Sequence, residues 1–467
     1  MVIRPLESAR RVLRPLRGAR STSSTTQAPA EVAAQAPPTL RVAHFSDTWL
    51  PRRDGIVTVL QTLAGAMDAL GHSSLLVVPR HPDLPKDDKN LLQIPSVPIG
   101  IAQFRIAQWP RSKHVEKIAH WLPNVVHVHT PGPIGLLGIF TARRLGLPLV
   151  LHYHTDLPAY ADAYRLPTSV LKAVMGCYAM RLSAPKLKYE KQPNKDERRR
   201  SVIDTGTALL FADADAVLVP TPAILNRCGG LPLLADRIYI APAGVGLPEV
   251  PAASRSAFRH EHGVGLDEPM VLFVGRVNRE KGIDTLTEAF GHVLKKVPTA
   301  RLVMVGAVYE KGWVKSLLDK AGIAERTVLT GQLSPDEVAR AYAAADVFAF
   351  PSMTDTQGLV VQEAALAGLP SLLADPALHA SSPIAAAGVL ASSDPAEYGQ
   401  ALTELLTDPE RRMALGQAAR DLARTNTPDE FAELMTTVYG RAVRRAASAT
   451  RESRRRRFRP SKAKLIA

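Results

Sequence analysis

The sequence lacks several features that would place it in other classes of protein. It has only two cysteines, Cys177 and Cys228, in 467 residues, too few for a disulfide framework or a cysteine-based zinc site, so a reducing compartment is favoured. No stretch of about 18 consecutive apolar residues occurs, so no transmembrane helix is expected. No G-x-G-x-x-G motif follows the first predicted strand, which argues against an ordinary dinucleotide-dependent oxidoreductase.

The central part of the chain also lacks any surplus of charge. Of the net charge of +14, residues 1–40 contribute +4 (six Arg, two Glu) and residues 441–467 contribute +10 (eleven Lys or Arg, one Glu), which leaves residues 41–440 neutral. Nucleic acid is therefore not expected as a partner. The basic tails could bind anionic lipid or could be solvated extensions. Residues 1–40 lack the apolar core of a secretory signal, and either a transit peptide or a disordered arm fits their composition.

What the chain does contain is a regular alternation of short apolar strands and amphipathic helices, which predicts parallel α/β sheets. In the first half the predicted strands are Arg41–Ser46, Ser74–Pro79, Val125–His129, Leu149–His154 and Ala216–Pro220. In the second half they are Met270–Val274, Leu302–Val305, Val328–Thr330, Val347–Phe350 and Ser371–Ala374. The two halves predict two separate doubly wound sheets, whose ligands bind at the carboxyl ends of the strands.

This pattern divides the chain into five predicted segments. They are a disordered basic arm (1–40), a first Rossmann-like domain (41–240), a second Rossmann-like domain (241–428), a C-terminal helix (429–445) and a disordered basic tail (446–467).

Three loops after strands of the second domain carry residues suited to a phosphorylated sugar ligand. In the loop Gly275–Gly282, Arg276 and Lys281 could reach a common anion such as a diphosphate, although a surface Arg/Lys loop would look the same. Gly306 follows another strand and predicts a tight turn or a close approach to a base or ribose.

The third loop, Asp355–Glu363, leads into a helix. Backbone amides near Gly358 could face a ligand at the helix N-terminus. Asp355 and Glu363 are spaced so that their carboxylates could accept hydrogen bonds from hydroxyls at opposite ends of one molecule. Taken alone, such a pair could equally be ordinary acidic decoration of a helix N-terminus.

Together these motifs resemble glycosyltransferase family 4. The matching segments are Phe273–Arg276, Lys281–Gly282, Asp355–Glu363 and Ala367–Pro370 in the second half, and Phe45–Thr58, Val126–Leu136 and Tyr153–Asp156 in the first. The likeness covers residues 41–440 and is strongest to the branch that glycosylates diacylglycerol or phosphatidylinositol. It implies a GT-B fold, in which two Rossmann-like domains face each other across a cleft, and transfer with retention, without a catalytic metal.

The resemblance assigns roles residue by residue. Arg276 and Lys281 would hold the diphosphate and offset the charge that develops as it departs. Asp355, where the family usually has Glu, would hold hydroxyls of the donor sugar, Glu363 would hold ribose hydroxyls, and His154 would orient the sugar. The remaining donor contacts implied are Gly55, Gly275, Gly306, Gln357, Gly358 and Leu359. Candidates on the acceptor side are Asp47, His129 and Asp156.

The chain also departs from the family pattern at two places. Ala241–Gly246 replaces the usual domain linker, and Asp375–Pro383 replaces the usual segment after Pro370. In the family, the usual segment after Pro370 helps to shape the donor site near Asp355. Because this chain lacks that segment, the donor preference stays open. The departures also keep open a catalytically weak protein that only binds nucleotide sugars.

The sequence therefore predicts a hexosyltransferase that moves mannose or glucose from a GDP- or UDP-linked sugar. The acceptor expected is a lipid or lipid-linked molecule at the cytosolic face of a membrane, to which the enzyme would be peripherally bound through its basic tails. A cell-wall or capsular glycan is the alternative acceptor. No cofactor beyond the nucleotide sugar is expected.

Overall fold

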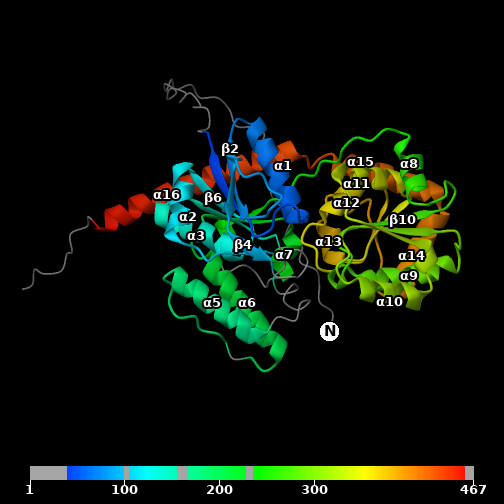
Figure 1. The fold of residues 1–467 in the computed structure, drawn as a ribbon, viewed down its shortest axis with the longest axis horizontal. Helices are drawn as coiled ribbons and strands as arrows, with labels where there is room; N and C mark the ends of the chain where they lie inside the picture. The colour runs from blue at the N-terminus through cyan, green and yellow to red at the C-terminus, as the bar shows by residue number, and fades with distance from the viewer. Residues whose placement is uncertain are drawn as a thin grey trace, which may run out of the picture. The chain divides into compact units, whose positions relative to one another are not determined.

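The computed structural model describes residues 39–98, 105–154, 157, 167–190, 192–227 and 235–457, which all belong to one compact unit, residues 39–467 (Figure 1). Residues 1–38, with most of the predicted N-terminal arm, and Asp156 and Cys228 lie outside the described residues.

The first half of the chain forms a parallel sheet of seven strands in the order β3-β2-β1-β6-β7-β8-β9. The strands are β1 (Arg41–Phe45), β2 (Ser73–Pro79), β3 (Leu91–Ile94), β6 (Val125–Val128), β7 (Leu149–His152), β8 (Ala216–Val219) and β9 (Ile238–Ile240). The central strands are rich in Val and Leu and buried on both faces, as is usual when helices cover both sides of a parallel sheet. A short antiparallel hairpin pairs β4 (Ser96–Pro98) with β5 (Arg105–Ala107).

Helices cover both faces of this sheet, and alternate strand residues contact different helices. On one face Ala43 and Phe45 pack with residues of α3 (Pro133–Leu145), whereas Val42 on the other face packs with α1 (Gly55–Ala69) and α16 (Pro428–Arg457). The other helices of this half are α2 (Ser112–His120), α5 (Thr168–Arg181), α6 (Lys195–Phe211) and α7 (Pro222–Arg227). The alternation follows from the period of two in a strand.

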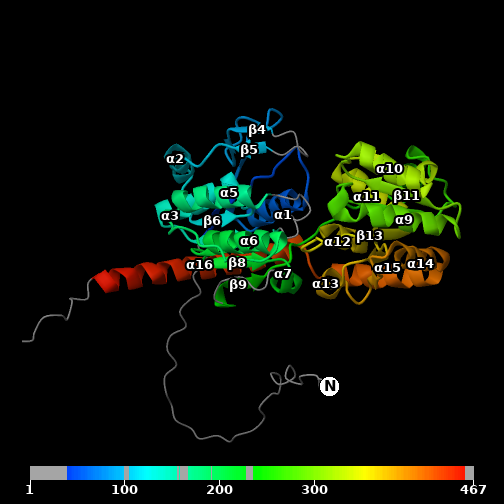
Figure 2. The same cartoon turned by 90° about the horizontal axis from the view of Figure 1, so that it is seen from below.

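The second half forms a parallel sheet of six strands in the order β12-β11-β10-β13-β14-β15, with helices on both sides (Figures 1 and 2). The strands are β10 (Met270–Val274), β11 (Arg301–Val305), β12 (Thr327–Gly331), β13 (Val347–Phe350), β14 (Ser371–Leu373) and β15 (Val389–Leu390). The helices are α8 (Ser254–Glu261), α9 (Ile283–Leu294), α10 (Lys311–Ala321), α11 (Pro335–Ala344), α12 (Leu359–Leu366), α13 (Pro376–Ser381), α14 (Pro395–Thr407) and α15 (Pro409–Ala423). The two doubly wound sheets predicted from the sequence are confirmed.

The last helix, α16, joins the C-terminal end of the chain to the first sheet. Phe431, Met435 and Tyr439 pack into the same cluster as Val42 of β1. The helix continues to Arg457 and not to residue 445, so the tail predicted from residue 446 is helical over its first part. The physical reason is that neither Gly nor Pro occurs between residues 446 and 457, where Ala and Arg favour the helix.

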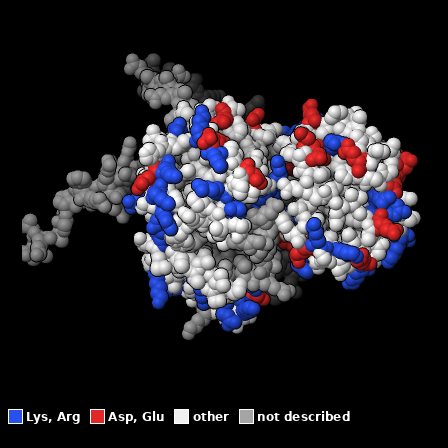
Figure 3. Space-filling view, viewed as in Figure 1, with Lys and Arg blue, Asp and Glu red and all other residues white. Residues whose placement is uncertain are grey.

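The described surface carries both signs of charge. Lys and Arg are interspersed with Asp and Glu over the face shown in Figure 3. Within the described residues no helix is long and apolar enough to span a membrane.

Candidate functional site

The loops after β10 and β13 meet in an ion pair. The Nζ atom of Lys281 lies 2.8 and 2.9 Å from the two carboxylate oxygens of Asp355, and both side chains are mostly buried. Burial alone would raise the pKa of Asp355, but the charge and hydrogen bond of Lys281, with help from Ser352 and Arg276, hold that pKa below its usual value. Asp355 is therefore a carboxylate at neutral pH, able to accept hydrogen bonds.

Arg276 has a carboxylate partner in the same loop. Its guanidinium forms an ion pair with Glu280, four residues later in the sequence. The structure thus brings Arg276, Lys281 and Asp355 into one neighbourhood, as the sequence predicted, since Arg276 also acts on the pKa of Asp355. An anionic ligand held by Arg276 and Lys281 would share these cations with the two carboxylates.

Glu363 lies inside α12 and is held by a residue that sequence reasoning missed. Its carboxylate accepts a hydrogen bond of 2.8 Å from the hydroxyl of Tyr342 on α11. Burial raises the pKa of Glu363, although the bond from Tyr342 acts in the opposite direction. Tyr342 fits the apolar pattern of its helix, and that pattern predicts a core position but not a contact with Glu363.

The N-terminus of α12 is shaped by Gly358 and Gln357. Gly358 has a φ of 67°, a left-handed conformation that suits glycine and that turns the chain into the helix. The side chain of Gln357 is buried and bonds both backbone groups of Ala243, with distances of 2.8 and 2.9 Å. Gln357 thus ties the altered linker Ala241–Gly246 to this loop, and only its backbone is left for a donor contact.

Gly306 and Gly275 end neighbouring strands and touch each other. Gly306 has a φ of 143°, and a Cβ atom placed on it would lie 1.9 Å from the carbonyl oxygen of Gly275. Gly306 therefore allows the two backbones to approach each other and helps to place the Gly275 loop. The approach of Gly306 to a base or ribose stays a prediction.

Replacing Gly306 by alanine is expected to destabilise the protein by about 1–3 kcal/mol, because the side chain would meet both a forbidden φ and a carbonyl oxygen. The measurement is the melting temperature by circular dichroism. Gly65→Ala in α1, where a Cβ would meet nothing within 4 Å, is the matched control and is expected to be neutral or stabilising. Equal melting temperatures for the two variants would contradict this account of Gly306.

In the first half, Asp47 holds the start of α3 in place. Its carboxylate accepts hydrogen bonds from the Thr130 hydroxyl (2.6 Å) and from the amides of Ile134 (2.8 Å) and Gly135 (3.3 Å) at the start of α3. Burial raises its pKa, while these hydrogen bonds act against that rise. Asp47, predicted as an acceptor contact or a loop-shaping residue, shapes the loop before α3.

Two further predicted residues lie near the loop of Asp355. The hydroxyl of Thr356 donates a hydrogen bond of 2.8 Å to the carbonyl oxygen of His154. A Cβ on Gly55, at the start of α1, would lie 3.5 Å from the Cδ1 atom of Leu359. The residues from the first half, Gly55 and His154, thus adjoin the N-terminal end of α12.

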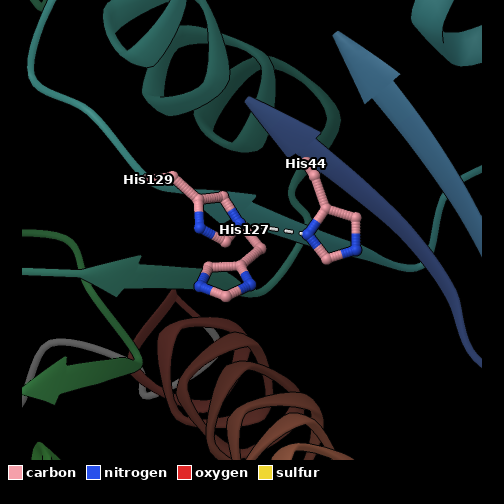
Figure 4. A group of neighbouring side chains, drawn as sticks. All are labelled: His44, His127 and His129. Carbon is pink, nitrogen blue, oxygen red and sulfur yellow. Dashed lines mark hydrogen bonds between the residues drawn. The ribbon is translucent and has the colours of Figure 1, made fainter. Parts of the chain in front are cut away.

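His154 and His129 belong to a group of five neighbouring histidines, the others being His44, His127 and His152. Nδ1 of His129 lies 3.0 Å from Nε2 of His154. On its other side, Nε2 of His129 lies 3.1 Å from Nδ1 of His44 (Figure 4). His129 is 1% exposed, whereas His154 is partly exposed. Of the acceptor-side candidates, Asp156 lies outside the described residues.

An apolar pocket adjoins these histidines. His129 and His154 form part of its wall, and the rest is largely apolar, including Ile139, Leu151, Tyr153, Leu210 and Phe211. Its walls come from β6, α3, β7 and α6, so no single sequence motif could predict it. Its cavity volume is about 30 Å³, which leaves room only for a small, water-sized group beside the imidazoles.

Comparison with known families assigns both halves of the chain. Residues 53–247 match the family described as "Glycosyltransferase Family 4", and residues 254–422 match "Glycosyl transferases group 1". Similar proteins include an alpha-monoglucosyldiacylglycerol synthase from Streptococcus pneumoniae, 26% identical over 71% of this chain and 70% of that protein. A D-inositol 3-phosphate glycosyltransferase from Segniliparus rotundus is 32% identical over 70% of this chain and 68% of its own length.

The fold is likewise shared with solved structures. HepE from Anabaena, determined in complex with UDP-glucose, has a TM-score of 0.63 at 15% identity, over 86% of this chain and 99% of its own. The similarity supports the GT-B fold predicted from the sequence.

Proposed function

Because the chain belongs to glycosyltransferase family 4, we propose that it transfers a hexose, mannose or glucose, from a GDP- or UDP-linked donor to a lipid or lipid-linked acceptor at the cytosolic face of a membrane. We further propose that transfer retains the anomeric configuration and uses no catalytic metal. The observation that carries this proposal is the buried pair of Lys281 and Asp355 beside the N-terminus of α12.

The donor site supplies the charges that such a reaction needs. As the bond between sugar and diphosphate breaks, negative charge grows on the diphosphate, and Arg276 and Lys281 offset it. The carboxylate of Asp355 accepts hydrogen bonds from sugar hydroxyls and Glu363 accepts those of the ribose. Gly358 turns the chain into α12 in a left-handed conformation, and the first backbone amides of that helix would face the donor.

The lipid acceptor is supported by the relatives. The Streptococcus pneumoniae relative is named for a diacylglycerol glycolipid.

The altered segment after Pro370 is a formed part of the site. Asp375 caps α13 by accepting hydrogen bonds from the amides of Ala377 (2.9 Å) and Leu378 (3.2 Å). Leu378 in turn lies against Gly358, since a Cβ there would be 3.2 Å from its Cδ2 atom. This packing places the altered segment against the N-terminus of α12.

The test is to incubate the purified full chain with a panel of UDP- and GDP-sugars, scoring thermal shift and donor consumption with and without vesicles of diacylglycerol and anionic phospholipid. We expect one donor to stabilise the protein and to be consumed faster with the vesicles. Stabilisation without turnover, with every lipid and glycan acceptor tried, would favour the binding protein instead.

Deleting residues 446–467 is expected to weaken binding to anionic vesicles, because it removes eight Lys or Arg and one Glu, at about 1 kcal/mol per basic residue near the surface. Residues up to Ala442, the last buried residue of α16, are kept. The measurement is vesicle co-sedimentation at low and high salt, since the attraction is screened. A full-length variant with Arg451 and residues 454–457 changed to Gln serves as control for chain length. Unchanged binding in both variants would make the tail a solvated extension.

A further inference from the structure

Three histidines form a hydrogen-bonded series that leads from the core of the first sheet to the candidate site. His44 is on β1, His129 follows β6 and His154 follows β7, and these three strands are neighbours in the sheet. The two contacts, 3.1 Å and 3.0 Å, both join an Nδ1 atom to the Nε2 atom of the next ring. His44 and His129 are each 1% exposed, so the series opens to solvent only at His154.

Each ring of the series carries a single proton at neutral pH. Burial lowers the pKa of all three, to about 3 for His44 and His154, so the imidazoles are neutral. A neutral imidazole has one N–H donor and one acceptor nitrogen. The three tautomers are therefore coupled, and both hydrogen bonds must run in the same direction.

The buried end of the series selects the direction. Nε2 of His44 is buried and has no hydrogen-bond partner. If the hydrogen bonds were donated inward, from His154 to His129 and from His129 to His44, His44 would carry its own proton on Nε2. That N–H would be buried and unpaired, which is rare and unfavourable. If the hydrogen bonds are donated outward, from His44 to His129 and from His129 to His154, Nε2 of His44 has only a free lone pair. All three rings then carry the proton on Nδ1. The outward direction makes Nδ1–H of His154 the terminal donor.

A shared metal ion explains the same group less well. Ring nitrogens of His44, His127 and His129, and of His129, His152 and His154, lie within 4.8 Å of one another. However, the ring centroids of His127 and His129 are 3.9 Å apart and those of His152 and His154 are 3.6 Å apart. Rings bound to one zinc ion at 2.0–2.1 Å radiate from it, with centroids about 5 Å apart. Neither set contains a carboxylate to balance a buried dication.

We propose that His44 and His129 are positioning residues that fix the tautomer of His154, so that His154 presents Nδ1–H to an oxygen of the bound donor. The ligand in this inference rests on the proposed function, whereas the tautomer does not. The carbonyl oxygen of His154 is held by Thr356 of the donor loop at 2.8 Å, which fixes the backbone that carries the ring. His154 then orients the sugar or diphosphate as an uncharged donor throughout the neutral pH range.

The test is nuclear magnetic resonance of the full chain with ¹⁵N-labelled histidine, with His154 assigned by the signals lost in His154→Asn. Free neutral imidazole favours the proton on Nε2, so a His154 protonated on Nδ1 marks the series. We expect Nδ1–H in the natural protein and a return to Nε2–H in His129→Phe. His260→Phe, the same change at an exposed histidine of α8, should leave the His154 signals unchanged.

Activity gives the second measurement. His129→Phe should lower kcat about tenfold, the usual scale for one oriented hydrogen bond, with little change in KM for the donor. Nε2–H on His154 in the natural protein would overturn the inference, and so would a stoichiometric metal ion with coordination-shifted ¹⁵N signals. The spectrum of the natural protein decides this even if His129→Phe does not fold. A correct tautomer without any turnover would count against the proposed function alone.

Discussion

Replacing Lys281 by alanine is expected to lower turnover about 100- to 1,000-fold. This is the usual loss when an enzyme lacks one group that stabilises the negative charge developing on a reacting oxygen. Lys281 also forms an ion pair with Asp355. Its loss therefore removes both the positive charge proposed to face the diphosphate and the ion-pair partner of a mostly buried carboxylate. The measurement is kcat and KM for the donor found in the nucleotide-sugar panel. Glu363→Ala should also cost orders of magnitude in kcat/KM, through loss of the ribose contact.

The control for Lys281→Ala must separate catalysis from stability. Removing the Lys281 charge from beside the mostly buried carboxylate of Asp355 should lower the melting temperature. The double variant Lys281→Ala with Asp355→Asn also removes the charge of that carboxylate and should recover most of the melting temperature, but none of the turnover. Lys315→Ala, on the exposed face of α10, should change neither quantity. Rates near those of the natural protein for both Lys281→Ala and Glu363→Ala would exclude the assigned site.

The strands and loops that carry the site could be predicted from sequence because they depend on local patterns. The buried runs at β10, β11 and β13 are continuous in Val, Leu and Phe, and each is followed by Gly or Pro. The strands that were missed, β3, β4, β5, β9 and β15, are only two to four residues long, too short to show a clear periodic pattern. Of these, β3, β9 and β15 lie at the edges of their sheets, and β4 and β5 form the separate hairpin.

Contacts between distant segments could not be predicted in this way. Gln357 meets Ala243, and Tyr342 meets Glu363, only because the fold brings these elements together. The histidines are an intermediate case. The spacing of two in His127/His129 and His152/His154 places each pair on one face of its strand, but the link to His44 requires the strand order β1-β6-β7.

Five histidines with low exposure on one sheet face should make the protein unusually sensitive to mild acid. Burial lowers the pKa of His44, His127, His129, His152 and His154. Below the ordinary histidine pKa of about 6.5 the unfolded chain therefore binds protons that the folded protein does not. Stability is fully present above that pH and is lost as the pH falls towards the folded-state values, which are about 3 for His44 and His154.

The free energy of unfolding is expected to change steeply with pH because the contributions of the five histidines add together. Each contributes up to about 1.4 kcal/mol per pH unit to the free energy of unfolding, so five can remove several kcal/mol between pH 6.5 and 5. Asp47 and Glu363, whose pKa values burial raises, act in the opposite direction at the lower end of this window. The measurement is the urea midpoint and the melting temperature between pH 7.5 and 4.5.

His152 provides the sharpest test of this sensitivity, since neither of its ring nitrogens has a hydrogen-bond partner. His152→Phe therefore removes one titrating group without breaking a hydrogen bond. It should reduce the change of the free energy of unfolding per pH unit by the contribution of one histidine, and it should lower the pH at which the protein unfolds. His260→Phe controls for the loss of an exposed histidine. A melting temperature that stays level from pH 7.5 to 4.5 would mean that the buried imidazoles take up protons in the folded protein. The neutral series from His44 to His154 would then fail together with this prediction, because its direction depends on each ring carrying a single proton.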